Sequence, residues 1–252
     1  MNIPDWDKRI PPCHFSSDKF VDYLPQIENA INNNLPYSWI RIGDGEESVL
    51  GQDYLYPINN VKAHVGWWNN DKYCGTTLPN IELRDRMINA YKGSEAIGVF
   101  INSKPTIDIF SKAGIEPKQI FYAYDNVHLP MNIRFVRMLC KYKILVVCGG
   151  LRENRNGQYY AEELNKRLDI NVEFVNLPRN YNDLNECMNQ IRIKDFDLAL
   201  VSAGVNAKVI CYEMSREMNK AFMDFGHGFD NAFYEDDKGN YKDYFLLDKS
   251  ML

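Results

Sequence analysis

Three features are missing from this 252-residue sequence, and each absence excludes a class of protein. The chain has no apolar run of roughly 18 residues, so no membrane-spanning helix is predicted. Its first residues, MNIPDWDKRIPPCHF, contain no apolar segment, and we expect no secretory signal there. Basic residues are in a minority, since 29 Lys and Arg face 34 Asp and Glu for a formal net charge of -5. Bulk charge therefore argues against a nucleic-acid partner.

Paired cysteine motifs are also missing. The six cysteines include no C-x-x-C pair, so neither a zinc ribbon nor a thioredoxin-like motif is predicted. Cys140, Cys148 and Cys211 lie in apolar segments, where a thiol behaves as a small hydrophobic side chain. We therefore expect a reduced, cytoplasmic protein without structural zinc.

What the sequence does contain is a regular alternation of short apolar segments and longer amphipathic ones. Strands are expected at 37–43, 96–102, 119–125, 143–150, 171–178, 197–204 and 221–226, with helices between them. This alternation is typical of βαβ units on a parallel sheet. We predict an α/β, Rossmann-like fold with a mainly parallel sheet of about six or seven strands flanked by helices. One domain is expected over 1–252, with a cap helix at about 16–34 and a tail at about 231–252.

In the segment RIGDGEESVL, residues 41–50, three acidic residues lie beside two glycines, just after a predicted strand: Asp44 stands between Gly43 and Gly45, and Glu46 and Glu47 follow. Asp44 and Glu46 are two residues apart, so both side chains would leave on one side if the chain stays extended past the strand. Such a pair would attract a hard divalent cation, which lets a diphosphate bind where bare carboxylates repel it. The alternative is that Glu46 and Glu47 only complement a helix N-terminus, at roughly 0.3–1 kcal/mol each.

Several predicted strands end in glycine or polar residues, as in RIGDGE, FINSK, CGGLREN, VSAGVNAK and DFGHGFD. Because the carboxyl ends of parallel strands share one sheet edge, these residues predict a nucleotide-sized crevice. In VSAGVNAK, Gly204 permits close backbone approach, and Lys208 in the first helical turn could contact phosphate or simply face solvent. The chain has neither a Walker loop nor a G-x-G-x-x-G fingerprint.

Other candidate residues lie in or beside these strands. Arg41 lies inside the first strand, where an unpaired charge is costly, so it could pair with Asp44 or Asp224 or contact phosphate. Asp125 follows another strand and could bind ribose or act as a base. Trp67 and Trp68, in the irregular segment 51–79, could stack on a sugar or pack in the core.

Three blocks, WIRIGDGE, LVSAGVNAKVI and FMDFGHG, together resemble the GT-D glycosyltransferases over roughly residues 36–230. These bacterial enzymes, some of which extend glycans on serine-rich adhesins, have a Rossmann-like domain with a D-x-E motif after the first strand. Their characterised activity is metal-dependent glucosyl transfer from UDP-glucose. The resemblance implies a UDP-sugar donor, a glycan or glycoprotein acceptor, and Mn²⁺ or Mg²⁺ as cofactor.

The resemblance also assigns roles to individual residues. It implies that Asp44 and Glu46 hold the metal beside the donor diphosphate, and that His227 acts as a third ligand or contacts the transferred sugar. A purely structural histidine is the alternative for His227. The residues expected to be catalytic are Asp44, Glu46 and His227. The expected nucleotide-sugar contacts are Arg41, Gly43, Gly45, Asn102, Asp125, Ser202, Gly204 and Lys208.

Two other functions fit parts of the sequence. A Rossmann-like methyltransferase also has a glycine-rich turn after its first strand, but it would use an acidic residue at the end of the next strand, where this chain has Asn102. A non-catalytic nucleotide-sugar binding module is the second alternative. The oligomeric state and the anomeric outcome of the transfer stay open.

Overall fold

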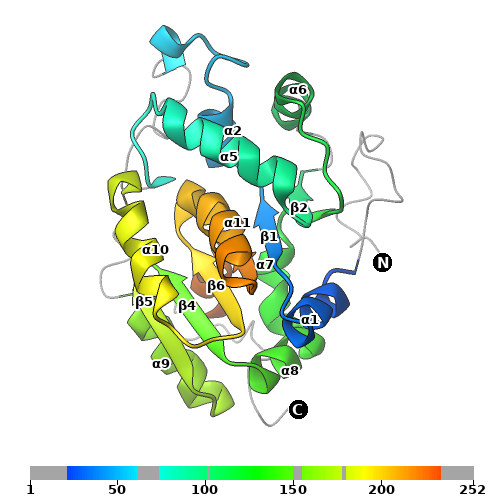
Figure 1. Ribbon diagram of the computed structural model, residues 1–252, viewed down its shortest axis with the longest axis vertical. Helices are drawn as coiled ribbons and strands as arrows, with labels where there is room; N and C mark the ends of the chain where they lie inside the picture. The colour runs from blue at the N-terminus through cyan, green and yellow to red at the C-terminus, as the bar shows by residue number, and fades with distance from the viewer. Residues whose placement is uncertain (1–21, 62–73, 101–102, 150–154, 178–179, 234–252) are drawn as a thin grey trace, which may run out of the picture.

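The computed structural model describes residues 22–61, 74–100, 103–149, 155–177 and 180–233. Within them, seven strands form one sheet in the order β3-β2-β1-β7-β6-β4-β5, and every neighbouring pair is parallel (Figure 1). The strands are β1 (Tyr37–Arg41), β2 (Ala96–Val99), β3 (Ile120–Tyr122), β4 (Ile144–Cys148), β5 (Val172–Asn176), β6 (Leu198–Ser202) and β7 (Ala221–Asp224). The predicted α/β class and parallel sheet are confirmed.

Helices cover both faces of the sheet because successive strand residues point to opposite sides. In β1, Ile40 packs in the core of one face and Trp39 in the core of the other. The first face is covered by α2 (Asp44–Leu50), α5 (Ile81–Gly93), α6 (Lys104–Ala113), α10 (Leu184–Arg192) and α11 (Ala207–Met218). The second is covered by α1 (Leu24–Asn32), α8 (Ile133–Lys141), α9 (Gly157–Leu168) and α12 (Gly228–Ala232). Short 3₁₀ turns occur at Ile58–Asn60, Leu129–Met131, Tyr181–Asp183 and Gly204–Asn206.

The connections reverse direction between β4 and β6, which are neighbours in the sheet. The chain leaves β4 through α9 towards β5 at the sheet edge, and it leaves β6 through α11 towards β7 nearer the centre. Since α9 and α11 pack on opposite faces, the connections that leave the carboxyl ends of β4 and β6 diverge and leave a crevice between them. Ligands of open α/β sheets bind at such a switch point.

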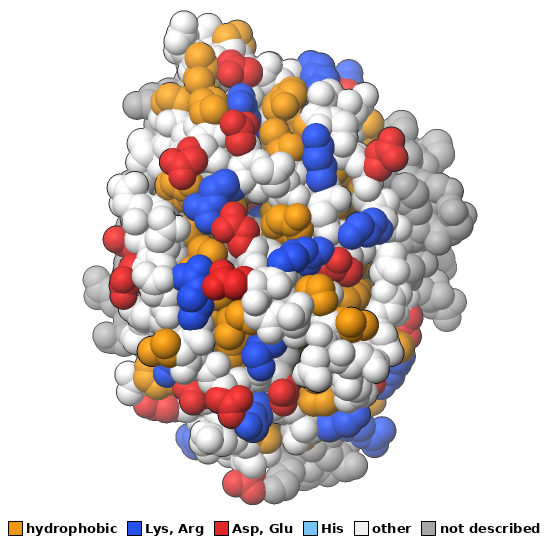
Figure 2. Space-filling model, viewed as in Figure 1, with side chains coloured by type: hydrophobic (Ala, Val, Ile, Leu, Met, Phe, Trp, Pro, Cys, Tyr) orange, Lys and Arg blue, Asp and Glu red, His pale blue; other side chains and the backbone are white. Residues whose placement is uncertain are grey.

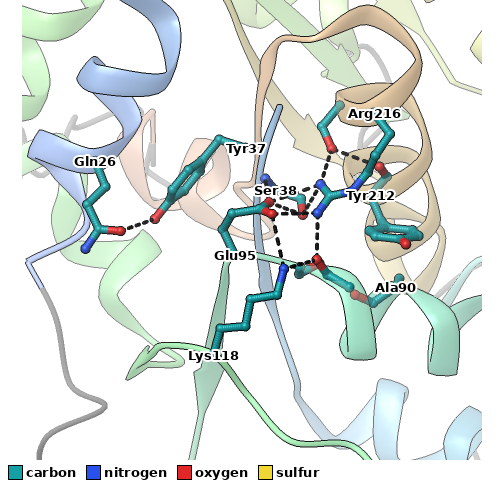
Figure 3. Close-up of polar contacts among 11 residues, drawn as sticks. Gln26, Tyr37, Ser38, Ala90, Glu95, Lys118, Tyr212 and Arg216 are labelled. Carbon is teal, nitrogen blue, oxygen red and sulfur yellow. Dashed lines mark hydrogen bonds and ion pairs between the residues drawn. The ribbon is translucent and has the colours of Figure 1, made fainter. Parts of the chain in front are cut away.

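A polar cluster closes the opposite, amino-terminal end of the sheet (Figure 3). Glu95, just before β2, receives the Arg216 guanidinium at 2.6 Å and the Ser38 backbone N–H at 2.8 Å. Lys118 lies 3.5 Å from the same carboxylate, and the Tyr212 ring lies under the guanidinium. Although burial alone would raise the pKa of Glu95, Arg216 and the Ser38 N–H hold it below the ordinary value.

The exposed face over α5, α10 and α11 mixes acidic and basic side chains (Figure 2). Two ion pairs span neighbouring helices there, Arg86–Glu213 at 2.7 Å and Arg192–Glu217 at 2.5 Å. No helix in the described part of the chain combines the length and the apolarity that crossing a bilayer would require.

Several predicted boundaries were wrong. Helix α1 begins at Leu24 rather than near residue 16, and Pro25 lies in its first turn, where a missing N–H costs no helical hydrogen bond and causes no kink. The strand expected to reach residue 125 ends at Tyr122, and the short helix α7 (Asp125–His128) follows. Most of the predicted tail, residues 234–252, lies outside the described part of the chain.

Candidate active site

A cavity of about 590 Å³ opens at the carboxyl-terminal edge of the sheet. Residues at or just after the ends of all seven strands line it. Representative lining residues, in the order β1 to β7, are Gly43, Phe100, Tyr122, Cys148, Leu177, Ser202 and Gly226. The cavity therefore crosses the switch point between β4 and β6 and continues towards β3, as the glycine-bearing strand ends predicted.

The acidic segment after β1 does not continue as extended chain. The strand ends at Arg41, Gly43 is the extended N-cap, and Asp44 is the first residue of α2. The expectation that Asp44 and Glu46 leave the chain on one side is therefore wrong, because helical residues two apart point in nearly opposite directions. Residues three apart share a helix face, so the residue that accompanies Asp44 is Glu47.

Asp44 lies exposed at the cavity wall. Its Oδ1 accepts the Gly45 backbone N–H at 2.9 Å, and it joins no ion pair among the described residues. Partial burial raises the pKa of the Asp44 carboxyl, although the Gly45 N–H opposes this rise, and the charge of Glu46 raises it further. Asp44 is thus a carboxylate near a second negative charge and near the His227 imidazole, which acts to lower its pKa, and no ion pair within the described residues includes it.

Glu46 points back into the protein. Its Oε2 accepts the backbone N–H of Gly43 at 2.8 Å, which satisfies one of the orphan donors at the start of α2. Its Oε1 lies 2.5 Å from the Lys208 ammonium. One carboxylate oxygen of Glu46 therefore caps the helix N-terminus, as the helix-terminus interpretation predicts, and the other forms a buried ion pair with Lys208.

Lys208 belongs to a buried four-charge cluster, which we call the charge cluster: Arg41, Glu46, Lys208 and Asp224. The Lys208 ammonium lies 2.5 Å from Glu46, 2.9 Å from Asp224 and 3.2 Å from the Gly204 carbonyl oxygen, while its side chain is 2% exposed. Arg41 Nε donates to the Asp224 carbonyl oxygen at 3.2 Å and lies 3.5 Å from its carboxylate. Two cations thus balance two anions inside the protein.

This pairing explains the shifted acidities in the charge cluster. Burial alone would lower the pKa of Lys208, but the carboxylates of Asp224 and Glu46 outweigh burial and hold it above the ordinary value. Burial alone would raise the pKa of Asp224, but Arg41 and Lys208 hold it below the ordinary value. Of the alternatives for Arg41, pairing with Asp224 is confirmed. Lys208 contacts three acceptors and is 2% exposed, so the solvent-facing alternative is wrong, whereas its contact with phosphate stays a prediction, because Lys208 also lines the cavity.

The glycine-bearing turns after β6 and β7 fit closely against their neighbours. Gly204 has φ of +55°, and a Cβ there would lie 2.7 Å from the Cys74 carbonyl oxygen. Gly226 has φ of +48°, and a Cβ there would collide with the Arg41 guanidinium. The Ser202 hydroxyl donates to the Gly226 carbonyl oxygen at 2.5 Å and joins the two turns. Packing against Cys74 and Arg41 therefore requires glycine at both positions.

His227 lies at the cavity rim with its side chain 68% exposed, and its Nδ1 is 3.3 Å from Asp230. Asp230 in turn accepts the Tyr160 hydroxyl at 2.7 Å. No group of three or more His, Cys, Asp or Glu side chains within the described residues is preassembled to hold a metal ion. Asp44, Glu46 and His227 line one cavity without forming such a cluster.

Other sequence candidates lie elsewhere. Asp125 does not line the cavity; its carboxylate hydrogen-bonds the Tyr23 side chain, which belongs to the core of the second face. Burial raises the pKa of Asp125 to about 6. Asn102, Trp67 and Trp68 lie outside the described residues.

Sequence reasoning missed two features of the cavity wall. Glu47 lines the cavity and accepts hydrogen bonds from the hydroxyls of Ser103 and Thr106. Phe100, Tyr122 and Tyr124 line the same cavity from the ends of β2 and β3. The signal in the sequence for Glu47 is its three-residue spacing from Asp44, because residues three apart share a helix face.

Comparison with known proteins gives one matching family and similar solved structures. The sequence model of a family described as a GT-D fold-like domain matches residues 21–232. A solved structure described as "The highly conserved domain of unknown function 1792 has a distinct glycosyltransferase fold" is 14% identical, with 82% of this chain and 78% of that chain covered and a TM-score of 0.49. A selenomethionine-substituted structure of domain of unknown function 1792 has the same identity and coverage, with a TM-score of 0.51. No curated protein matches the chain.

Proposed function

This chain belongs to the GT-D-like family, and from that premise we propose that it is a metal-dependent glycosyltransferase. We propose that it moves a hexose, with glucose the first choice, from a UDP-sugar to a glycan or glycoprotein acceptor. The observation that supports this most directly is the cavity that runs from the β4–β6 switch point past Asp44 to the end of β3. Its length along the sheet edge suits a nucleotide at one end and a sugar at the other.

The charges of the cavity wall support a cation. Its described lining includes four carboxylates, Asp44, Glu46, Glu47 and Asp230, and two basic side chains, Arg41 and Lys208. Both basic side chains already contact Asp224 or Glu46. A diphosphate would therefore meet uncompensated negative charge, and an additional cation is needed to bind it.

Mn²⁺ or Mg²⁺ fits the residues present. Asp44 offers a carboxylate at the cavity wall, His227 offers an exposed imidazole, and Glu46 lies behind Asp44 in the same helical turn. A divalent cation held by few protein ligands and completed by phosphate oxygens and water is a common arrangement. When bound, it would offset the charge that develops on the departing diphosphate.

The residues of the chain supply the rest of the proposed chemistry. The N-terminal turn of α2 directs Asp44 at the cavity, while the charge cluster fixes the turn from behind through Glu46. The turns at Gly204 and Gly226 bring backbone close to the cavity, where a nucleotide can lie against it.

The deciding experiment measures UDP-glucose hydrolysis and UDP binding by the full chain, with and without Mn²⁺. Asp44→Asn keeps the shape of the side chain and removes one charge, so we expect turnover to fall by at least about 100-fold, or roughly 3 kcal/mol of transition-state stabilisation. The matched control is Asp195→Asn, which changes an exposed aspartate near the amino-terminal end of β6; its turnover should stay near that of the wild type. Tight UDP-glucose binding without turnover in any condition would instead favour a binding module.

A further inference from the structure

Three aromatic side chains form one cluster at the β2–β3 end of the cavity. The ring centroids of Phe100 and Tyr124 lie 4.8 Å apart, those of Tyr122 and Tyr124 lie 5.8 Å apart, and those of Phe100 and Tyr122 lie 6.3 Å apart. All three pairs meet edge to face, at interplanar angles of 65°, 67° and 85°. We call Phe100, Tyr122 and Tyr124 the aromatic cluster.

The aromatic cluster is held in place and still accessible. Edge-to-face contacts favour fixed ring orientations, so each ring supports the other two. Yet Tyr124 remains 49% exposed, and Phe100 and Tyr122 are only partly buried. Large aromatic side chains grouped at the wall of an open cavity are a feature of ligand sites, because a core would have covered them.

A carboxylate lies in the same part of the cavity. Glu47 is oriented by the hydroxyls of Ser103 and Thr106. The Ser103 backbone N–H donates to the Phe100 carbonyl oxygen at 3.1 Å, so the residues that orient Glu47 and those that carry the aromatic cluster belong to one local structure. The Glu47 carboxylate, an acceptor of hydrogen bonds, therefore lies beside the aromatic cluster.

We propose that the aromatic cluster and Glu47 form a pyranose-binding subsite. A pyranose ring has one face of C–H groups, which an aromatic ring covers well, and an edge of hydroxyls, which a carboxylate accepts. The nucleotide is expected at the β4–β6 switch point, and the subsite lies at the other end of the cavity. The inference rests on the proposed function, since the sugar belongs either to the donor or to the acceptor.

The test uses Tyr124→Ala, with Tyr124→Trp as the variant that keeps a ring and Tyr142→Ala as a control at the amino-terminal end of β4. Because Tyr124 is half exposed, its truncation should leave the fold intact, and the melting temperature checks this. Affinities are measured for UMP, UDP and UDP-glucose by calorimetry, and for methyl β-glucopyranoside in the presence of UDP by nuclear magnetic resonance titration.

We expect Tyr124→Ala to weaken sugar binding by about fivefold to tenfold, with Tyr124→Trp and Tyr142→Ala close to wild type. Loss of the affinity difference between UDP-glucose and UDP would place the donor hexose in the subsite. Loss of methyl glucopyranoside binding would place the acceptor sugar there. Glu47→Gln should weaken the same ligand as Tyr124→Ala.

Two results would overturn the inference while leaving the proposed function standing. One is an equal loss of UMP affinity in Tyr124→Ala, which would show that the aromatic cluster stacks on the base. The other is unchanged affinity of every ligand. If the wild type binds neither UDP nor UDP-glucose, the proposed function fails instead, and the methyl glucopyranoside titration still reports on the subsite.

Discussion

Replacing Lys208 with methionine tests the charge cluster directly. The Lys208 side chain is 2% exposed, and its ammonium joins two carboxylates from distant parts of the chain, Glu46 and Asp224. Methionine has a similar length and no charge, so Lys208→Met leaves three buried charges where four balanced one another. Removing one partner of a buried ion pair costs about 3–5 kcal/mol, because the other partner stays buried without compensation.

The expected effect is large enough to measure by thermal unfolding. For a chain of this size each kcal/mol moves the melting temperature by about 2–4 °C, so Lys208→Met should lower it by about 6–20 °C. Adding Glu46→Gln to Lys208→Met removes the stranded negative charge. The double variant should recover about 1–3 kcal/mol relative to the sum of the single changes. Lys143→Met, at an exposed lysine paired with Asp195, is the control and should change the melting temperature little.

The alternative role of Lys208 predicts a different result. If Lys208 mainly contacted the donor diphosphate, Lys208→Met would lower UDP affinity strongly and leave the melting temperature within about 3 °C of wild type, the shift expected for roughly 1 kcal/mol. That pattern, or a double variant no more stable than the sum of its parts, would refute the reasoning from burial and pairing. UDP titration and thermal unfolding on the same samples separate the two.

Three further predictions concern stability. Because folding lowers the pKa of Glu95, its carboxylate stabilises the folded state above the unfolded pKa of about 4.3, and this stabilisation is lost as pH falls through the folded-state pKa. Glu95→Gln should therefore lower the melting temperature at pH 7, and the gap between the melting temperatures of the variant and the wild type should shrink below about pH 4. Because burial raises the pKa of Asp125 to about 6, ionising this buried carboxyl destabilises the folded state, so the stability of the wild type relative to Asp125→Asn should fall as pH rises from about 4 to 7. The variant should then have the higher melting temperature at pH 7.5; equal melting temperatures of the two proteins across that range would contradict this. Gly226→Ala should destabilise more than Gly114→Ala in urea unfolding, since both have positive φ but only the former methyl would meet the Arg41 guanidinium; equal losses would show that backbone strain alone decides.

Periodicity in the sequence was sufficient to predict the architecture. Whether a segment is a strand or a helix depends mainly on the spacing of its own apolar residues, as in the alternating strands and helices between residues 96 and 226. A parallel sheet then brings the strand ends to one edge. The turns at Gly43, Gly204 and Gly226 were therefore predicted to meet, and they line one cavity.

The direction of individual side chains at that edge was not predictable in the same way. Because α2 begins at Asp44 and the chain does not stay extended, Glu46 turns back towards Lys208 and Glu47 lies at the cavity wall beside Ser103. A one-residue change in a helix boundary rotates every following side chain by about 100°, and local sequence rarely fixes boundaries that closely. Similarly, because β3 ends at Tyr122, Asp125 begins α7, where its carboxylate meets the Tyr23 side chain instead of the cavity.

Partnerships between charges were decided by the tertiary structure alone. Lys208 meets Glu46 across 162 residues of sequence, and Arg41 meets Asp224 across 183. The sequence showed only that Arg41 lies inside a strand and needs a partner, because an unpaired buried charge is costly. Which partner it finds depends on the strand order, which places β7 beside β1 and packs α11 over both. The sequence alone therefore determined that Arg41 had to be neutralised, and only the folded arrangement decided that Arg41, Glu46, Lys208 and Asp224 neutralise one another, because it buries all four together.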